Sequence, residues 1–404
     1  MKKLVFFLLF GLPFLAEAQG FQVSLQGQKQ QAMAGAGTGL VQDGASLFYN
    51  PGAASFLQNS VSLGATPVIS HGQYTDKSSS VVSETTSPVS YPFTGYMVLG
   101  DKKSKFRYGF AAYTPFGSTI DWQQGWTGRF VMTHTQLYSV YLQPTVSYKV
   151  NEKLGIGAGF VYGIGKVNQQ NDLPFTDNQG NFGKAEIDAS GRGYGFNAGI
   201  YYKPSSVLSL GFTYHSQVEI KDKKGMATFT VPASLATSFP SGEFSTSLSL
   251  PKIITLGIGI APTKKLTIAF DASLIGWHTF DTLLIDFKVN TPVLADIKSV
   301  RQYKDGYALR LGGQYAICNK LDARAGIKYL ISPVQDGYVS PDVPDATHFN
   351  YSIGLGYKLS KHLTADASFT FQRMKRSDTN NQTELSGTYR TDIYMPGLSI
   401  NYNF

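Results

Sequence analysis

Alternation of apolar residues with glycine or polar residues is the feature that most restricts the fold of this sequence. Between residues 154 and 165, apolar side chains take one set of alternate positions and glycines fill nearly all the others. The pattern returns at 321–329 and 351–359. A period of two residues is typical of a β-strand with two different faces, and helical stripes are nearly absent. The sequence therefore predicts an all-β protein.

The connections between these segments alternate in length. Short turns such as GDKKSK, VNEK and LSKH alternate with long polar connections, among them 168–191, 217–249 and 276–305. An even strand number with short turns at one rim and long loops at the other is the arrangement of an outer-membrane barrel. We therefore predict a 14-stranded antiparallel transmembrane β-barrel over residues 60–404. Its strands are expected near 60–70, 92–100, 106–114, 136–150, 153–167, 192–203, 206–216, 250–261, 265–275, 306–317, 320–331, 349–359, 363–374 and 390–404.

The two ends of the chain indicate export to the bacterial outer membrane. Two lysines, an apolar run and Ala16-Glu17-Ala18 have the order of a secretory signal, so residues 1–18 are predicted to be a cleaved signal peptide. At the other end, Phe404 follows Tyr402 on one face of the last strand. This terminal aromatic is similar to the signal that the barrel-assembly machinery reads. We expect that machinery and outer-membrane lipid to be partners.

Composition and motifs argue against an enzyme. The single cysteine, Cys318, allows no intramolecular disulfide, and no G-x-S-x-G, C-x-x-C or G-x-G-x-x-G motif occurs. The six histidines are scattered, with no pair at metal-ligand spacing. The formal net charge of +8 is not gathered into a nucleic-acid surface. We predict no catalysis, no metal, no cofactor and no nucleic-acid partner.

Several charged residues fall on the sparse, inward faces of their strands. In one interpretation they form a network of opposite charges that keeps the lumen polar. In the other, Arg107, Arg310 and Arg324 are candidates for holding an anionic head group by paired hydrogen bonds. The whole inward set is Arg107, Asp271, Arg310, Asp322, Arg324, Lys328 and Asp366.

The third predicted strand contains a break. The stretch FRYGFAAYTPFGSTIDW alternates as far as Tyr113 and then meets Pro115, Phe116 and Gly117. Proline cannot donate to a β-ladder, so pairing should be interrupted there. The break is either the end of the strand or an inward kink that opens a gap in the barrel wall.

Longer stretches resemble the FadL family (FadL/TodX type), outer-membrane transporters of long-chain fatty acids and other hydrophobic compounds. The family's loops, strands and N-terminal plug are similar to GWTGRF with SVYLQPTVSYKVNEKLGIGAGF, to LPKIITLGIGIAPTKKLTIAFDASLIGWHTFDTLLIDF, to SPVQDGYVSPDVPDATHFNYSIGLGYKLSKHLTADASF, and to QGFQVSLQGQKQQAMAGAGTGLVQDGASLFYNPGAASF. The resemblance implies that residues 19–59 form a hatch inside the barrel. Without such a plug, this segment would be a disordered leader.

The residues of the predicted hatch suit a compact plug. Asn50 can bond its own downstream backbone and Pro51 presets the first helical position, so NPGAASF predicts a tight turn into a short helix. The small residues of AMAGAGTG can pack against glycine-rich lumen faces. Gly52 stands where the family commonly has alanine, which should loosen the helix start by roughly 0.5–1 kcal/mol.

The resemblance also implies a path for passive uptake of hydrophobic molecules. A ligand would enter a groove among the loops 168–191 and 217–249, settle in an interior pocket, move Gly20 and Phe21, and leave beside Pro115 to Gly117. The alternatives are a general diffusion porin and a surface adhesin on a barrel. The family's barrels work as single chains, so we expect a monomer. The apolar groove candidates are Leu173, Phe175, Phe182, Val231, Leu235 and Phe239.

Overall fold

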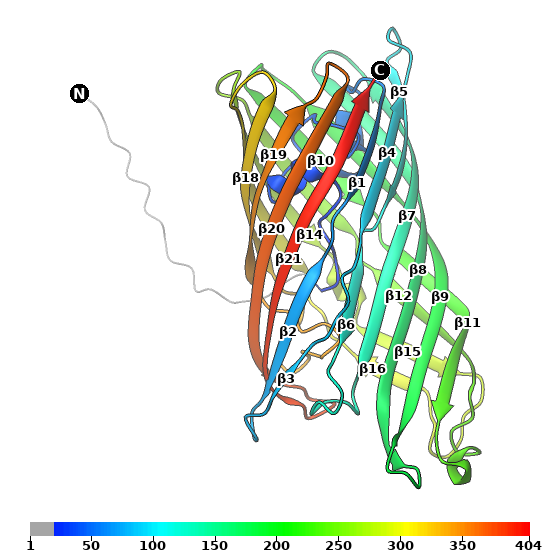
Figure 1. Ribbon diagram of the computed structural model, residues 1–404. Coiled ribbons are helices and arrows are strands. Elements are labelled where there is room, and N and C mark those ends of the chain that lie inside the picture. Colours follow the sequence, from blue (N-terminus) through cyan, green and yellow to red (C-terminus); the bar gives the residue numbers. More distant parts are fainter. Residues whose placement is uncertain (1–19) are drawn as a thin grey trace.

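The computed structural model describes residues 20–404, so the predicted signal peptide at 1–18 lies outside the described residues. The fold is a tall, tilted barrel with the short turns and the C-terminus at one end (Figure 1). No helix in the described part of the chain is long and apolar enough to cross a membrane.

Fourteen strands close into an antiparallel barrel, as the alternation predicted. The wall closes where the first and last strands pair, with Ser60 opposite Asn403. In order around the barrel the strands are β1 (Ser60–Ala65), β4 (Phe93–Leu99), β5 (Phe106–Tyr113), β7 (His134–Lys149), β8 (Leu154–Thr176), β9 (Phe182–Tyr202), β10 (Leu208–His215), β13 (Ile253–Ile260), β14 (Leu266–Ile275), β17 (Gly306–Ala316), β18 (Leu321–Ile331), β19 (His348–Lys358), β20 (Leu363–Thr379) and β21 (Ser386–Asn403).

The prediction that the long connections are loops is wrong for most of 168–191 and 217–249 and for part of 276–305. β8 and β9 continue as a hairpin far beyond the predicted strand ends. On β9, Lys184 and Glu186 alternate with Gly183 and Ala185, whereas residues 168–172 of β8 are all polar. The ladder can extend outside the membrane because water solvates these polar side chains. The further elements are β2 (Ile69–Asp76), β3 (Val82–Glu84), β6 (Gly117–Asp121), β11 (Val218–Thr230), η1 (Ala233–Leu235), β12 (Gly242–Leu250), η2 (Trp277–Thr279), β15 (Thr282–Phe287) and β16 (Ile297–Val300).

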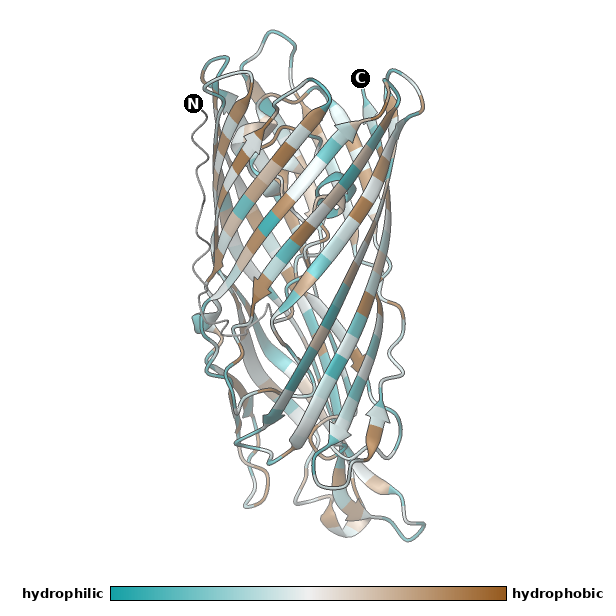
Figure 2. Ribbon diagram, turned by 90° about the vertical axis from the view of Figure 1, so that its left-hand side faces the viewer, coloured by the Kyte–Doolittle hydropathy of each residue, from teal (hydrophilic) through white to brown (hydrophobic). Residues whose placement is uncertain are grey.

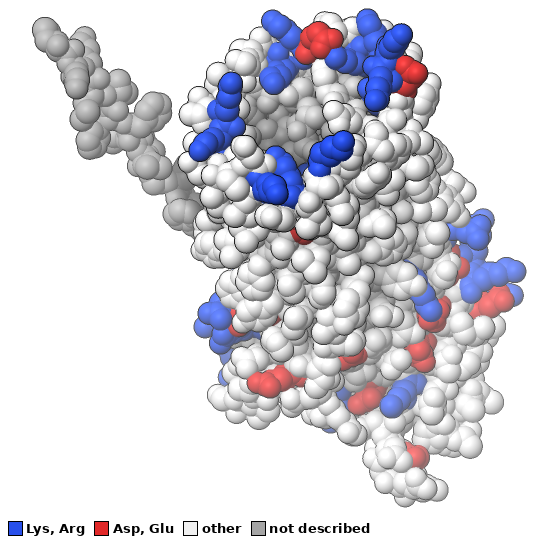
Figure 3. Space-filling view, turned by 45° about the horizontal axis from the view of Figure 1, so that its top comes forward, with Lys and Arg blue, Asp and Glu red and all other residues white. Residues whose placement is uncertain are grey.

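The outer face carries an apolar band. On β21, Leu398 is 69% exposed while Asn401, which faces inward, is 3% exposed. Hydrophobic colouring is concentrated in the half of the barrel nearer the short turns (Figure 2). In space-filling view, a nearly uncharged wall separates a mainly basic rim at the short-turn mouth from mixed charges at the other end (Figure 3). An apolar band between two charged zones is the surface that a bilayer requires.

Residues 20–59 run through the inside of the barrel, and we call them the luminal segment (Figure 1). They include three short helices, α1 (Gln28–Ala32), α2 (Ser46–Tyr49) and α3 (Pro51–Ala54). The glycines of the inner wall are their contact surface. A Cβ placed on Gly312 would lie 2.5 Å from the Cβ of Met33, and one placed on Gly257 would lie 2.6 Å from the Gly39 nitrogen. The glycine-rich inner faces of the strands therefore leave the space in which the luminal segment packs against the wall.

Candidate functional site

The third strand is interrupted at the predicted position. β5 ends at Tyr113 and β6 begins at Gly117, and both pair with β7. At the break, Phe116 keeps its hydrogen bonds to Ser139 of β7, and the backbone groups on either side of it bond to the luminal segment. Val23 N donates to Pro115 O (2.9 Å), and Gly117 N donates to Phe21 O (3.0 Å). The start of the luminal segment thus acts as a short strand that covers the break from inside.

Phe21 anchors this short strand. Its side chain is 5% exposed and its ring packs edge-on against Trp277 (4.8 Å between centroids) and Phe280 (5.6 Å). The ring of Phe116, from the break itself, lies 6.2 Å away. The structure therefore brings together two groups that the sequence analysis named separately, the N-terminal residues and the kink.

Gly20 joins the luminal segment to a distant loop. Its backbone amide donates to the Asp345 carboxylate (2.6 Å), which also accepts from the Ser332 hydroxyl (3.0 Å). Gly20 has φ +63 and lies against the Trp277 ring, so a side chain at this position would be strained and crowded. Burial raises the pKa of Asp345 to about 7, even though these hydrogen bonds favour its ionised form.

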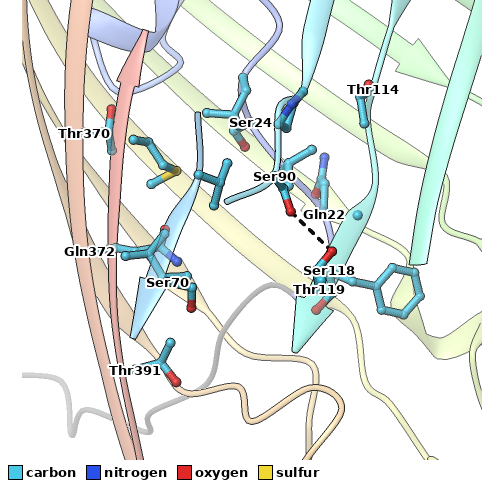
Figure 4. A pocket seen from close by; sticks show the side chains of 18 of the residues that line it. Gln22, Ser24, Ser70, Ser90, Thr114, Ser118, Thr119, Thr370, Gln372 and Thr391 are labelled. Carbon is cyan, nitrogen blue, oxygen red and sulfur yellow. Dashed lines mark hydrogen bonds between the residues drawn. The ribbon is translucent and has the colours of Figure 1, made fainter. Parts of the chain in front are cut away.

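A cavity of about 530 Å³ lies beside the covered break. Side chains of β20 and β21, among them Thr370 and Thr391, form one side of it, and Ser118 and Thr119 of β6 form another (Figure 4). The luminal segment closes one end with Gly20–Leu25. Its lining is mainly apolar, and its volume falls in the range of about 300–1,000 Å³ typical of small-molecule sites.

The wall next to this cavity is held by isolated contacts. Between residues 85–92 and residues 117–122, the described structure has one bridge, Thr85 with Trp122, and a backbone hydrogen bond from Thr86 N to Asp121 O (2.7 Å). Two further bonds involve side chains: Asp121 N donates to Ser87 Oγ (3.1 Å), and the Ser90 hydroxyl donates to Thr119 Oγ1 (3.2 Å; Figure 4). Pro88 and Pro92 have no amide hydrogen to offer a ladder. This stretch forms no continuous ladder with β6.

One end of the cavity is polar and cationic. Lys328, 5% exposed, is the one lysine or arginine among the described lining residues, and its ammonium makes no hydrogen bond or ion pair with any of them. Asn350 lies opposite it on β19, and His348 is two positions before Asn350. The Nε2 atom of His348 and the Oδ1 atom of Asn350 are buried without a hydrogen-bond partner of ordinary geometry. An ammonium buried without a partner is costly, so Lys328 would stabilise an anionic group of a guest placed beside it, whereas Asp342 and Asp345, which also line the cavity, would not.

The three predicted head-group arginines lie away from this cavity. Arg107 donates from Nε to Leu57 O (2.9 Å) and from NH1 to carbonyls of the adjacent turn, which ties down the end of the luminal segment. Arg310 donates to Ser273 Oγ (2.6 Å). Arg324 forms a buried ion pair with Asp366 (2.7 Å). These places agree with the charge-network interpretation, and the head-group role of the three stays a prediction.

The predicted groove residues lie on the long connections at the end of the barrel away from the short turns, and their role as a groove stays a prediction. The rings of Phe175 and Phe239 lie 5.4 Å apart, next to an apolar cluster that includes Phe244 and Phe287. Phe182 packs instead on Phe130 (5.3 Å). Phe239 N donates to Leu235 O (3.1 Å), and Leu173 pairs with Gly183, next to Phe182. None of the six groove candidates lines the 530 Å³ cavity.

The predicted turn into a short helix is present at Asn50. Its Oδ1 accepts from Gly52 N (2.9 Å), and its Nδ2 donates to Thr38 O (2.8 Å) and to Ile200 O (3.0 Å). Pro51 opens α3. A Cβ on Gly52 would lie 2.7 Å from the carbonyl oxygen of Gly155, so glycine is required here by the close approach of β8.

Sequence reasoning placed Lys328 on the inward face but did not select it. The available signal was its position on the sparse face without an acidic residue opposite on the next strand. Among the described residues, no group of three histidine, cysteine or acidic side chains could hold a metal.

Comparison with known proteins identifies the family. Residues 12–404 match the model of the family described as outer membrane protein transport protein (OMPP1/FadL/TodX). The chain belongs to this family. It is therefore an outer-membrane protein of a family that transports hydrophobic compounds.

Individual relatives have low sequence identity to this chain but match most of its length. The chain is 22% identical to the long-chain fatty acid transport protein of Salmonella typhi, over 74% of each chain. The crystal structure of a Pseudomonas aeruginosa FadL homologue has a TM-score of 0.82 at 20% identity, covering 96% of this chain and 100% of that one. The Pseudomonas putida toluene transporter TodX has a TM-score of 0.76 at 18% identity, covering 94% and 98%.

Proposed function

We propose that this protein takes up long-chain fatty acids passively across the outer membrane, with lateral exit through the wall at the strand break. The observation that carries the proposal is the 530 Å³ apolar cavity, which combines an unpaired lysine at one end with the weakly paired wall beside it. A relative named for long-chain fatty acid transport supports this substrate class.

In this proposal Lys328 receives the carboxylate of the fatty acid. A charge-assisted hydrogen bond contributes about 1.5–3 kcal/mol, and the ligand's chain adds about 0.8 kcal/mol for each buried methylene. The unpartnered Nε2 of His348 and Oδ1 of Asn350 give the site further polar atoms for a protonated or hydrated head group. Contacts of the carboxylate with Lys328 would therefore provide selectivity for a fatty acid, and burial of its methylenes along the apolar lining would provide most of the affinity.

The luminal segment acts as the hatch in this proposal. Its first residues cover the break with two backbone hydrogen bonds and the Phe21 anchor. A ligand that displaces residues 20–23 opens the cavity toward the gap between residues 85–92 and β6. The exit then leads sideways into the membrane, and the rest of the segment keeps the pore closed to water-soluble solutes. We further propose that the barrel works as a monomer and is inserted by the barrel-assembly machinery.

The first test is uptake by an outer-membrane host that lacks its own transporter. Labelled long-chain fatty acid, toluene and a small sugar are compared in cells that express the full chain. Fatty-acid uptake without sugar entry is the expected result. Sugar entry would favour the diffusion porin, toluene uptake alone would refute the fatty-acid assignment, and cell binding without any uptake would favour the adhesin.

The head-group role is tested with Lys328→Met, with Lys320→Met on a short turn as the matched control. We expect Lys328→Met to lower fatty-acid affinity about 10- to 100-fold and to leave binding of an uncharged alkane unchanged. Equal losses for both ligands would mean that the lysine is structural. The same comparison with Arg107→Ala, Arg310→Ala and Arg324→Ala tests the earlier candidates.

The lateral exit is tested by repairing the strand. Pro115→Val with Gly117→Thr restores strand-forming residues at the break, and fatty-acid uptake should fall while ligand binding persists. Uptake at the wild-type rate with an intact, repaired wall would rule out this exit.

A further inference from the structure

A cluster of cations lies on the outer wall of the barrel, on the side opposite to the lumen. Arg373 and Lys375 of β20 and Arg390 of β21 alternate with inward-facing residues, and all three are exposed. Register places Arg373 opposite Asp392 and Lys375 opposite Arg390. The three cations thus form one patch across two neighbouring strands.

The depth of this patch follows from the strand itself. On the outer face of β21, exposed Tyr402, Ile400 and Leu398 form the apolar strip, and Tyr394 is its last aromatic residue. Residues 394–402 have the length that a tilted strand needs to cross the hydrocarbon, about 9–11 residues. The next outward positions are Asp392 and Arg390. The patch therefore lies directly beyond the apolar band, on the side away from the short turns, where outer-leaflet head groups are found.

The side chains of the patch are pre-arranged. Asp392, whose side chain is 14% exposed, accepts from Arg373 Nε and NH2 (2.5 and 3.1 Å) and from Arg390 NH2 (2.9 Å). The two guanidiniums keep side-chain exposures of 53% and 44%. The Arg373 guanidinium also lies over the Phe371 ring, 5.7 Å from its centroid. One carboxylate orients two cations and leaves an excess of two positive charges facing outward.

Two other outward cations on the extended strands at this end of the barrel are each paired with one carboxylate. Lys166 pairs with Asp188 (3.3 Å) and Lys221 with Glu219 (2.8 Å). The patch on β20 and β21 differs because three cations share a single carboxylate. Its planar, exposed guanidiniums suit phosphate oxygens, which they can bind in pairs.

We propose that Arg373, Lys375 and Arg390 form a binding site for the phosphate groups of an outer-leaflet glycolipid. The acyl chains of that lipid would lie along the strip of Phe369, Leu398 and Ile400, which is continuous with the patch. The site is separate from the luminal cavity, so it can be tested independently of uptake.

The experiment measures phosphorylated glycolipid bound to the full-length protein purified from outer membranes, by native mass spectrometry. The test variant is Arg373→Ser/Lys375→Ser/Arg390→Ser, and the matched control is Lys102→Ser/Lys103→Ser/Lys361→Ser, which removes the same charge from the short turns. Heat-modifiable electrophoretic mobility reports barrel folding in each. We expect affinity for added glycolipid to fall at least about tenfold in the test variant and to stay at the wild-type level in the control.

A second arm uses dephosphorylated glycolipid and phosphatidylglycerol. Wild-type protein should bind the phosphorylated glycolipid at least tenfold more tightly than its dephosphorylated form, and the triple variant should abolish that preference. Retained binding in a folded triple variant, equal loss in the control, or equal binding of phosphatidylglycerol would each overturn the proposal. If the triple variant does not fold, the single change Lys375→Ser must still weaken binding, because Lys375 has no ion-pair partner in the described structure.

Discussion

The cover over the strand break should depend on the side chain of Phe21. Replacing this residue with alanine removes a ring that is 95% buried among Phe116, Trp277 and Phe280. Phenylalanine-to-alanine changes in packed sites cost about 3–5 kcal/mol, whereas each backbone hydrogen bond of the cover contributes roughly 0.5–1.5 kcal/mol. The ring therefore accounts for most of the attachment. A loss of about 3 kcal/mol raises the detached fraction roughly a hundredfold.

Amide hydrogen exchange followed by mass spectrometry measures this detachment directly. Peptides that cover residues 20–27 should exchange about a hundredfold faster in Phe21→Ala, while barrel peptides keep their protection. Phe175→Ala is the matched control, because that ring packs at the far, extracellular end against Phe239. Unchanged exchange at 20–27 in Phe21→Ala, or equal acceleration in the control, would refute the assignment of Phe21 as the anchor.

Three further outcomes are expected. Gly52→Ala should lower the free energy of unfolding by roughly 1–3 kcal/mol, whereas Gly242→Ala, which has open space, should not; urea midpoints compare them. Asn50→Ala should cost about 1–3 kcal/mol by the same assay, since it orphans two buried carbonyls. Because the Gly20 amide favours ionised Asp345, lowering the pH through about 7 should weaken this contact: exchange at residue 20, corrected for its intrinsic rate, should accelerate, and Asp345→Asn should abolish the pH dependence.

The pH dependence of global stability has the opposite sign for the same carboxyl. Its folded pKa of about 7 lies above the usual value of about 3.9, so the folded protein holds the extra proton between these two values. This contribution to stability is complete below about pH 4 and is lost as the pH rises through 7. Urea midpoints that rise with pH in wild type relative to Asp345→Asn over this window would contradict the burial of this group.

Local pattern was sufficient to predict the strands. The residues from 154 to 165 place every large side chain on one face and almost only glycine on the other, which leaves a single orientation in a wall with lipid outside. The proline and glycine at 115 and 117 likewise marked the break, because a missing amide donor is a property of the residue itself.

The features that could not be predicted from the sequence depend on contacts between residues far apart in the chain. Outside the membrane, polar strands and polar loops have similar amino-acid composition. The sequence therefore did not indicate that β8 continues as a strand to Thr176. Lys328 differs from Arg324 because no acidic side chain in the described structure pairs with it, whereas Arg324 pairs with Asp366. The sequence alone does not show this difference. The role of Asp345 was equally hidden, because its partner Gly20 lies at the other end of the chain.

The contact between Gly20 and Asp345 spans 325 positions of the sequence. Nearly the whole chain must be threaded and paired before the first described residues find their partners, and the wall itself closes only when Asn403 meets Ser60. Contacts of such high order form late in folding. A half-assembled barrel would therefore lack this seal, so the luminal segment reaches its final contacts only when the wall itself is nearly closed.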